Sequence, residues 1–206
     1  MAIALTAAVA LSLTYVLAVW TRAGQALDTH AMVLTARYLT GADWTRGLLE
    51  MISPGTVVVA VAVLGGLVWV LEGAATAVAA TATAVGTVLG AAALKAFLVR
   101  PALVDEAANS LPSGHVAAVA GLAAGAALAA GRSVRPLVVL AGLGAVAVTG
   151  LATSALRWHR PSDVLASALL AVPLARSLTR GSSPRRDSER LASFGDQVSF
   201  ELVRPQ

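Results

Sequence analysis

Two of the three histidines in this chain, His115 and His159, stand at the ends of apolar stretches, each in a short polar motif. His159 is followed four residues later by Asp163, and His115 comes directly after Pro112-Ser113-Gly114. Ionisable side chains where hydrocarbon meets water are costly, and they usually have a function. A carboxylate that accepts a hydrogen bond from one imidazole nitrogen makes the other nitrogen more nucleophilic. The two motifs therefore predict a catalytic site at a membrane surface.

The Pro112-Ser113-Gly114 turn has the features of an anion site. Gly114 permits a tight turn with exposed N–H groups, Ser113 adds a hydroxyl, and the following helix presents its positive end. His115 in this position can hold or deliver a proton. The plain alternative is a loop with a capping serine, just as Asp163 alone is an ordinary carboxylate near a helix start.

Lys95, the only lysine, and Arg100 end the apolar stretch that precedes this turn. Taken alone, Lys95 is explained by an ammonium group that reaches out of the bilayer to the lipid headgroups. Two cations together with two histidines and a glycine corner on one face instead indicate a phosphate-binding site.

The overall composition is that of a membrane protein. The 206 residues are 57% hydrophobic and only 13% charged, with a mean hydropathy of +0.78. A soluble domain of this size carries more charge, and apolar runs near 20 residues predict spanning helices. The absence of cysteine excludes disulfides and thiolate nucleophiles. The net charge of +4 comes mostly from arginines that are scattered along the chain. Membrane orientation and contact with anionic lipid explain this positive charge better than nucleic-acid binding does.

These patterns predict an all-α, polytopic bundle of six transmembrane helices in one domain, residues 1–178. The six expected spans are residues 2–20, 56–71, 74–99, 115–131, 136–156 and 161–178. We expect the first to be a retained span, because it lacks a basic leader. The mixed segment 21–54 predicts one or two short interfacial helices, with Asp28 and His30 on their solvated face. Residues 179–206 are expected to form a basic, disordered tail.

Six spans would place both termini on one side of the cell membrane and the histidine motifs on the other. Once basic residues needed for chemistry are discounted, arginines are more frequent on the side of the termini, although Arg22, Arg37 and Arg46 oppose this bias. The positive-inside rule assigns that side to the cytoplasm. The arginines on that side are Arg132, Arg135, Arg180, Arg185, Arg186 and Arg190. The predicted site is therefore extracytoplasmic.

Residues 95–166 resemble the core of the type 2 phosphatidic acid phosphatase (PAP2) superfamily of integral membrane lipid phosphatases. That family is marked by the motifs K-x6-R-P, P-S-G-H and S-R-x5-H-x3-D. The second motif is intact, as is the H-x3-D half of the third. Ala102 stands where the arginine of the first motif is expected, with Arg100-Pro101 two residues earlier, and Thr153 replaces the arginine of the third. Arg157 and Arg160 are the candidates to supply its charge.

The resemblance implies a role for each motif residue. His159 would attack phosphorus and form a phosphohistidine, Asp163 would orient it, and His115 would protonate the leaving alkoxide and then help to activate water. The residues that would bind the phosphate are Lys95, Arg100, Ser113 and the Gly114 amide. No metal or cofactor is expected.

The substrate implied by the family is a lipid phosphate or diphosphate held in the bilayer, such as phosphatidic acid, phosphatidylglycerol phosphate or a polyprenyl (di)phosphate. Two other functions remain open. One is phosphotransfer to a second lipid, and the other is non-catalytic binding or transport of a lipid phosphate. No nucleic-acid partner is expected, and the oligomeric state is left open.

Overall fold

The computed structural model describes residues 2–39, 43–104 and 110–179, and all regular secondary structure in these ranges is helical. This confirms the all-α prediction. The helices are α1 (Ala2–Val19), α2 (Arg22–Tyr38), α3 (Asp43–Met51), α4 (Pro54–Glu72), α5 (Ala74–Phe97), α6 (Gly114–Ala129), α7 (Arg135–Ala155) and α8 (Pro161–Thr179). The tail predicted from residue 179 onward lies outside the described residues, apart from Thr179 itself, which ends α8.

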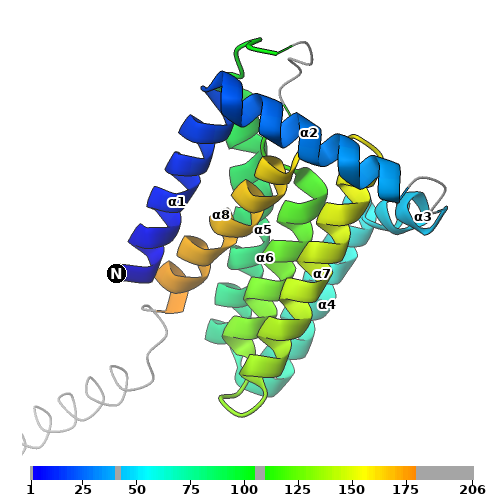
Figure 1. Cartoon of the computed structure of the whole chain (residues 1–206). Coiled ribbons are helices and arrows are strands. Elements are labelled where there is room, and N and C mark those ends of the chain that lie inside the picture. Colours follow the sequence, from blue (N-terminus) through cyan, green and yellow to red (C-terminus); the bar gives the residue numbers. More distant parts are fainter. Residues whose placement is uncertain (1, 40–42, 105–109, 180–206) are drawn as a thin grey trace, which may run out of the picture.

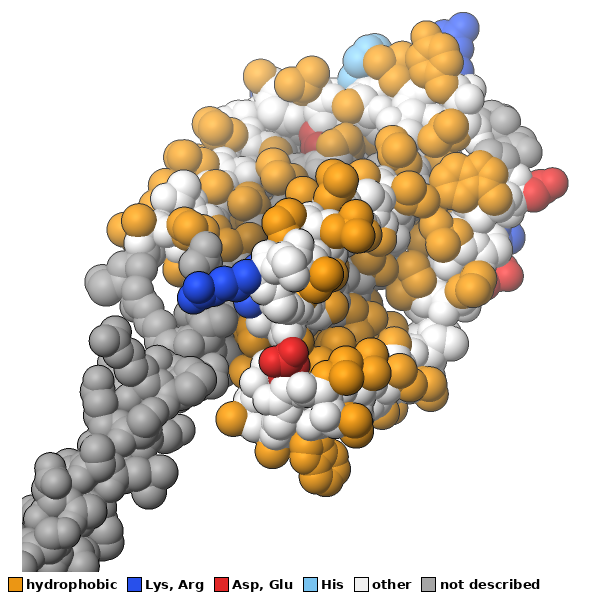
Figure 2. All heavy atoms as spheres, turned by 90° about the horizontal axis from the view of Figure 1, so that it is seen from below, with side chains coloured by type: hydrophobic (Ala, Val, Ile, Leu, Met, Phe, Trp, Pro, Cys, Tyr) orange, Lys and Arg blue, Asp and Glu red, His pale blue; other side chains and the backbone are white. Residues whose placement is uncertain are grey.

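Four of these helices, α1, α4, α5 and α7, are long and apolar enough to cross a membrane. Two further apolar stretches, Gly114–Ala129 in α6 and Pro161–Ala175 in α8, are shorter. The outer surfaces of these apolar helices carry large hydrophobic side chains whose exposure to water would be unfavourable, for example Leu67 and Val70 on α4. Figure 2, seen from the end opposite α2, shows many hydrophobic side chains across the part of the chain that is described, and few charged ones. The fold is that of a helical membrane protein.

Local sequence signals explain where several helices begin and end. Ser53 caps α4 in a reciprocal capping box with Thr56, and Pro54 occupies the first helical turn. Gly73 separates α4 from α5 with a φ of 89°, a conformation that disfavours other residues. Ser113 caps α6 with its hydroxyl group. These signals set the helix ends at which the polar motifs lie.

Small residues allow α5 and α6 to pack closely at the centre of the bundle (Figure 1). A Cβ atom at Gly121 would lie 2.9 Å from the carbonyl oxygen of Ala84, and one at Gly125 would lie 2.6 Å from that of Ala80. Such close approach of backbones is how helices associate when lipid competes for apolar surface. The α5–α6 pair therefore forms a tightly packed base for the polar motifs that lie directly before α6 and α8.

Helix α2 runs across the end of the bundle, over the start of α8, and α3 follows it (Figure 1). Helices thus occupy the predicted interfacial segment. Their solvent exposure was predicted incorrectly at one residue, because Asp28 is buried, with 7% of its surface exposed. It shares a helical face with Gln25, Met32 and Ala36, which are also buried. His30 is exposed, as expected.

Candidate active site

Backbone and side-chain hydrogen bonds join the two histidine motifs. The N–H of Ser113 donates to the carbonyl oxygen of Asp163 at 3.3 Å. The hydroxyl of Ser167, one turn further along α8, lies 2.9 Å from the Ser113 carbonyl and 2.8 Å from that of Asp163. All three residues are fully buried. Ser113, directly before α6, is thereby fixed against the first turn of α8.

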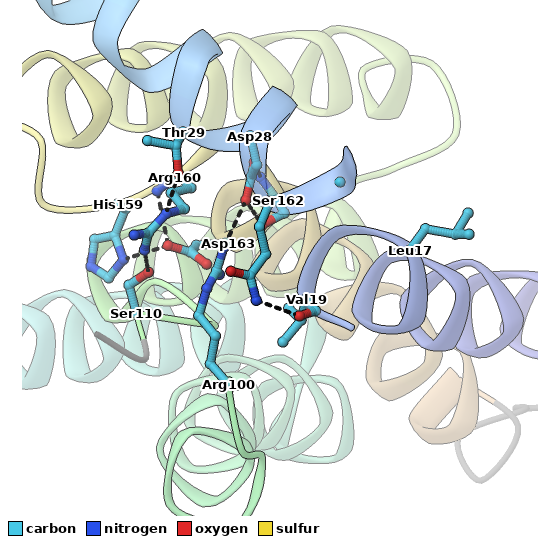
Figure 3. Close-up of polar contacts among 12 residues, drawn as sticks. Leu17, Val19, Asp28, Thr29, Arg100, Ser110, His159, Arg160, Ser162 and Asp163 are labelled. Atoms are coloured by element: carbon cyan, nitrogen blue, oxygen red, sulfur yellow. Dashed lines mark hydrogen bonds and ion pairs between the residues drawn. The ribbon is translucent and has the colours of Figure 1, made fainter. Parts of the chain in front are cut away.

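His159 and Asp163 form the expected pair (Figure 3). The Nδ1 atom of His159 lies 3.3 Å from Oδ2 of Asp163, and both side chains are buried. The same oxygen accepts the backbone N–H of Arg160 at 2.9 Å. With Nδ1–H donating to the carboxylate, Nε2 carries the lone pair and can act as a nucleophile.

The backbone of His159 is held from the preceding helix. The carbonyl oxygen of Thr153 accepts the N–H groups of Trp158 and His159 at 2.9 and 3.3 Å. Between Thr153 and Trp158, Arg157 adopts a left-handed conformation with a φ of 56°. This sharp turn from α7 to α8 sets the direction of the imidazole.

His115 lies at the start of α6, in the same part of the molecule as His159. Its half-buried ring is 5.8 Å from that of Trp158, measured between centroids. His115 is also close enough to His159 and Lys95 to interact electrostatically with both. Lys95, near the end of α5, is exposed. The structure therefore brings together the two histidines and the lysine that the sequence analysis selected.

The two residues of the glycine corner differ in accessibility. Gly114 is exposed, and a Cβ added there would meet no atom from another part of the chain within 4 Å. The hydroxyl of Ser113 is buried and accepts the N–H of Val116 at 3.5 Å. The serine therefore acts as a helix cap, which was the plain alternative, while its neighbours shape the site.

The two arginines proposed to replace the missing motif charge have different environments. Arg160 is buried, with Nη1 3.0 Å from the hydroxyl of Ser110 and Nε 3.3 Å from that of Thr29. Arg157 is exposed. Thr153, where the family has arginine, is fully buried and donates its hydroxyl to the Gly150 carbonyl. Arg160 therefore lies in the site, beside Asp163, and Arg157 faces outward.

Arg100 is buried between α2 and α8. Its Nη2 lies 3.6 Å from Oδ2 of Asp28, and none of its side-chain surface is exposed. It interacts electrostatically with Asp163 and Arg160. Burial lowers the pKa of Arg100 below its ordinary value and raises that of Asp28, which hydrogen bonds from Ser162 partly oppose. The arginine of the shortened first motif thus reaches the third motif.

Sequence reasoning missed the contribution of α2. Asp28 accepts the backbone N–H of Ser162 at 2.9 Å and also its hydroxyl. Gln25 donates from Nε2 to the carbonyl oxygens of Val19 and Pro101. The available signal was periodicity: two polar residues, 25 and 28, occupy the helical stripe that continues with the apolar residues 32 and 36.

The comparison with protein families agrees with this geometry. The model of the PAP2 superfamily matches residues 75–187, which is more than half of the chain and includes α6 to α8 and all but the first residue of α5. The chain belongs to the PAP2 superfamily. Members of this superfamily are generally phosphatases, which supports a hydrolase of phosphate esters. No curated protein and no solved structure matches the chain.

Proposed function

We infer that this chain hydrolyses a lipid phosphate or diphosphate through a phosphohistidine on His159. The observation that carries the proposal is the buried contact between His159 and Asp163, next to the motif that contains His115. A nucleophile and its orienting carboxylate are needed for covalent catalysis, whereas binding alone needs only cations and amides. The site therefore favours an enzyme over a lipid-phosphate binder.

In the first half of the reaction, Nε2 of His159 attacks phosphorus and a P–N bond forms as the P–O bond of the ester breaks. His115, as imidazolium, gives its proton to the leaving oxygen, so that the alcohol departs neutral. Asp163 accepts the Nδ1 hydrogen throughout and stabilises the charge that develops on the ring.

In the second half, water attacks the phosphohistidine while neutral His115 takes its proton. The P–N bond breaks, His159 is regenerated, and inorganic phosphate leaves. Lys95, Arg100 and the Gly114 N–H would stabilise the charge on the equatorial oxygens, since phosphoryl transfer depends mainly on positioning and electrostatics. Each role is filled by a side chain or backbone group of this protein.

A cavity supports a substrate with a hydrocarbon chain. It has a volume of about 370 Å³ and lies between α6, α7 and α8, with mostly apolar walls. The lining residues nearest the histidine motifs are Ala120 on α6 and Ala168 on α8. Ala120 comes five residues after His115, and Ala168 five residues after Asp163, which is about 7–8 Å along a helix axis. An acyl or prenyl chain held there would have its headgroup near the histidines.

For the membrane topology we propose six spans, α1 and α4 to α8, with α2 and α3 at the interface. The α6–α7 turn, with Arg132 and Arg135, lies at the end of the bundle opposite α2 (Figure 1). Basic residues are retained on the cytoplasmic side. Both termini would then be cytoplasmic, with the site at the extracytoplasmic surface.

The activity is tested by measuring phosphate release from a panel of lipid phosphates and diphosphates in detergent with a chelator. The wild type should turn over, and a labelled phosphoenzyme that is acid-labile and base-stable should form. His159→Ala should abolish both. Undiminished turnover by this variant would remove His159 from its role. Transfer of label to an added acceptor lipid would identify a phosphotransferase, and saturable binding without turnover would identify a binder.

The topology is tested separately in whole cells. Because the chain has no cysteine, single cysteines can be introduced at exposed positions on each end, His30 on α2 and Arg132 in the α6–α7 turn. A membrane-impermeant maleimide should label His30→Cys in intact cells and Arg132→Cys only after lysis. The reverse pattern would overturn the orientation.

A further inference from the structure

Asp28 contacts two elements of the site at once, from a helix outside the three family motifs. We propose that Asp28 is a positioning residue that fixes Arg100 relative to the His159–Asp163 pair. This inference rests on the proposed function, because it assigns Asp28 a role in binding the transferred phosphate.

The carboxylate of Asp28 joins the start of α8 to Arg100. Its Oδ1 accepts the backbone N–H of Ser162 at 2.9 Å, and its Oδ2 accepts the Ser162 hydroxyl. Oδ2 also lies 3.6 Å from Nη2 of Arg100. Ser162 directly precedes Asp163 in the first turn of α8. The Asp28 side chain therefore contacts both Arg100, which is proposed to bind phosphate, and the helical turn that contains Asp163 (Figure 3).

Arg100 needs such a counter-ion. Its guanidinium is fully buried, and within the described part of the chain its nitrogen atoms have no hydrogen-bond partner apart from the contact of Nη2 with Asp28. A buried cation without hydrogen bonds is strongly unfavourable. Asp28 supplies the opposite charge, and two phosphate oxygens could accept the buried N–H groups in a bidentate arrangement once the substrate displaces the groups that cover them. The arginine is thus held in place before the substrate arrives.

The rest of α2 supports the same arrangement. Gln25, on the same face as Asp28, donates to the carbonyl oxygen of Pro101 at 2.8 Å, which fixes the residue after Arg100. Thr29 accepts a hydrogen bond from Nε of Arg160 at 3.3 Å. Helix α2 therefore contacts Pro101, after α5, and the start of α8 through residues on successive helical turns. Asp28 is the residue whose charge couples the two.

The experiment is a double-mutant cycle on phosphate release. Asp28→Asn keeps the size of the side chain and removes its charge, so kcat/KM should fall about ten-fold or more, as for the loss of one aligned charge contact. In an Arg100→Gln background the same change should cost less than about two-fold, because the residue that it positions is gone. A merely structural role would give equal fold-changes in both backgrounds.

Two further variants keep the test decisive. Asp43→Asn makes the same chemical change at an exposed carboxylate in the first turn of α3 and should leave kcat/KM unchanged. If Asp28→Asn does not fold, Ser162→Ala removes one of its bonds and should give a smaller loss that shrinks likewise with Arg100→Gln. If the wild type is active, either of two results would overturn the inference. One is an Asp28→Asn variant with unchanged kcat/KM, and the other is a double variant whose loss equals the product of the losses of Asp28→Asn and Arg100→Gln. An inactive wild type would instead contradict the proposed function.

Discussion

The backbone N–H of Ser113 donates a hydrogen bond to the backbone carbonyl of Asp163. The bond joins the motif before α6 to the motif at the start of α8, and both partners are fully buried. Because it involves no side chain, the two motifs remain attached whichever rotamers the histidines adopt. The proposed acid and nucleophile can therefore act on one phosphorus atom from a common framework.

Ser167 reinforces this framework, and its removal should be measurable. Ser167→Ala deletes a buried hydroxyl that lies against both the Ser113 and Asp163 carbonyls, and should lower the free energy of unfolding by about 1 kcal/mol. The control is Ser12→Ala, an exposed serine on α1 that bonds a carbonyl four residues earlier. Denaturant unfolding in detergent should show a clearly smaller change for the control. Equal effects would mean that the link between the motifs adds no stability.

The close α5–α6 contact predicts a strong effect at Gly125. Gly125→Ala places a methyl group 2.6 Å from the Ala80 carbonyl oxygen, and such overpacking should cost about 1–3 kcal/mol of stability. At Gly144, on an exposed part of α7, no atom lies within 4 Å of the new Cβ. Gly144→Ala should be neutral or stabilising by up to about 1 kcal/mol, because alanine favours helix. Thermal unfolding compares the two, and a tolerated Gly125→Ala would contradict the packing described.

Arg160, rather than Arg157, is expected to replace the arginine missing from the third motif. Arg160→Ala should reduce kcat about ten-fold or more, since the guanidinium is buried and bonded to Ser110 and Thr29, while the backbone of the same residue bonds Asp163. Arg157→Ala should change kcat less than about two-fold, because an exposed charge is screened by solvent and salt. Steady-state kinetics with one lipid phosphate measures both. A larger loss at Arg157 would reverse the assignment.

The cavity between α6, α7 and α8 predicts chain-length selectivity. Ala124→Phe introduces a ring into the cavity wall and should reduce turnover of a long-chain lipid phosphate several-fold. Hydrolysis of a short, water-soluble phosphate ester should be preserved. Ala141→Phe, on an exposed part of α7, is the matched control for added bulk. If the ratio of the two substrates' turnover is the same in both variants, the hydrocarbon chain binds elsewhere.

Most of the bundle is predictable from the sequence. The expected spans agree with helices α1 and α4 to α8 to within a few residues, because uninterrupted apolar runs leave few alternatives to a helix. The pairing of His159 with Asp163 also agrees with their spacing, because His159 lies just before α8 and Asp163 in its first turn, so that the two side chains meet across the start of the helix. Local rules were sufficient for these features.

The role of α2 could not be deduced in the same way. A polar side chain in an amphipathic segment is normally solvated, and Asp28 becomes buried only because α2 crosses the start of α8. That crossing depends on contacts between distant parts of the chain, such as Gln25 with Pro101 and Thr29 with Arg160. Spacing within a motif contains no information about them. The choice between Arg157 and Arg160 likewise depended on the turn between α7 and α8.

The Thr153 carbonyl oxygen anchors the backbone N–H groups of Trp158 and His159. Every amino acid carries this carbonyl, so the anchor does not depend on which side chain occupies position 153. A lineage could therefore exchange arginine for threonine here without displacing the imidazole. The backbone that holds the proposed nucleophile is therefore separate from the side chains that set the charge around it, so that this charge can change while the imidazole keeps its position.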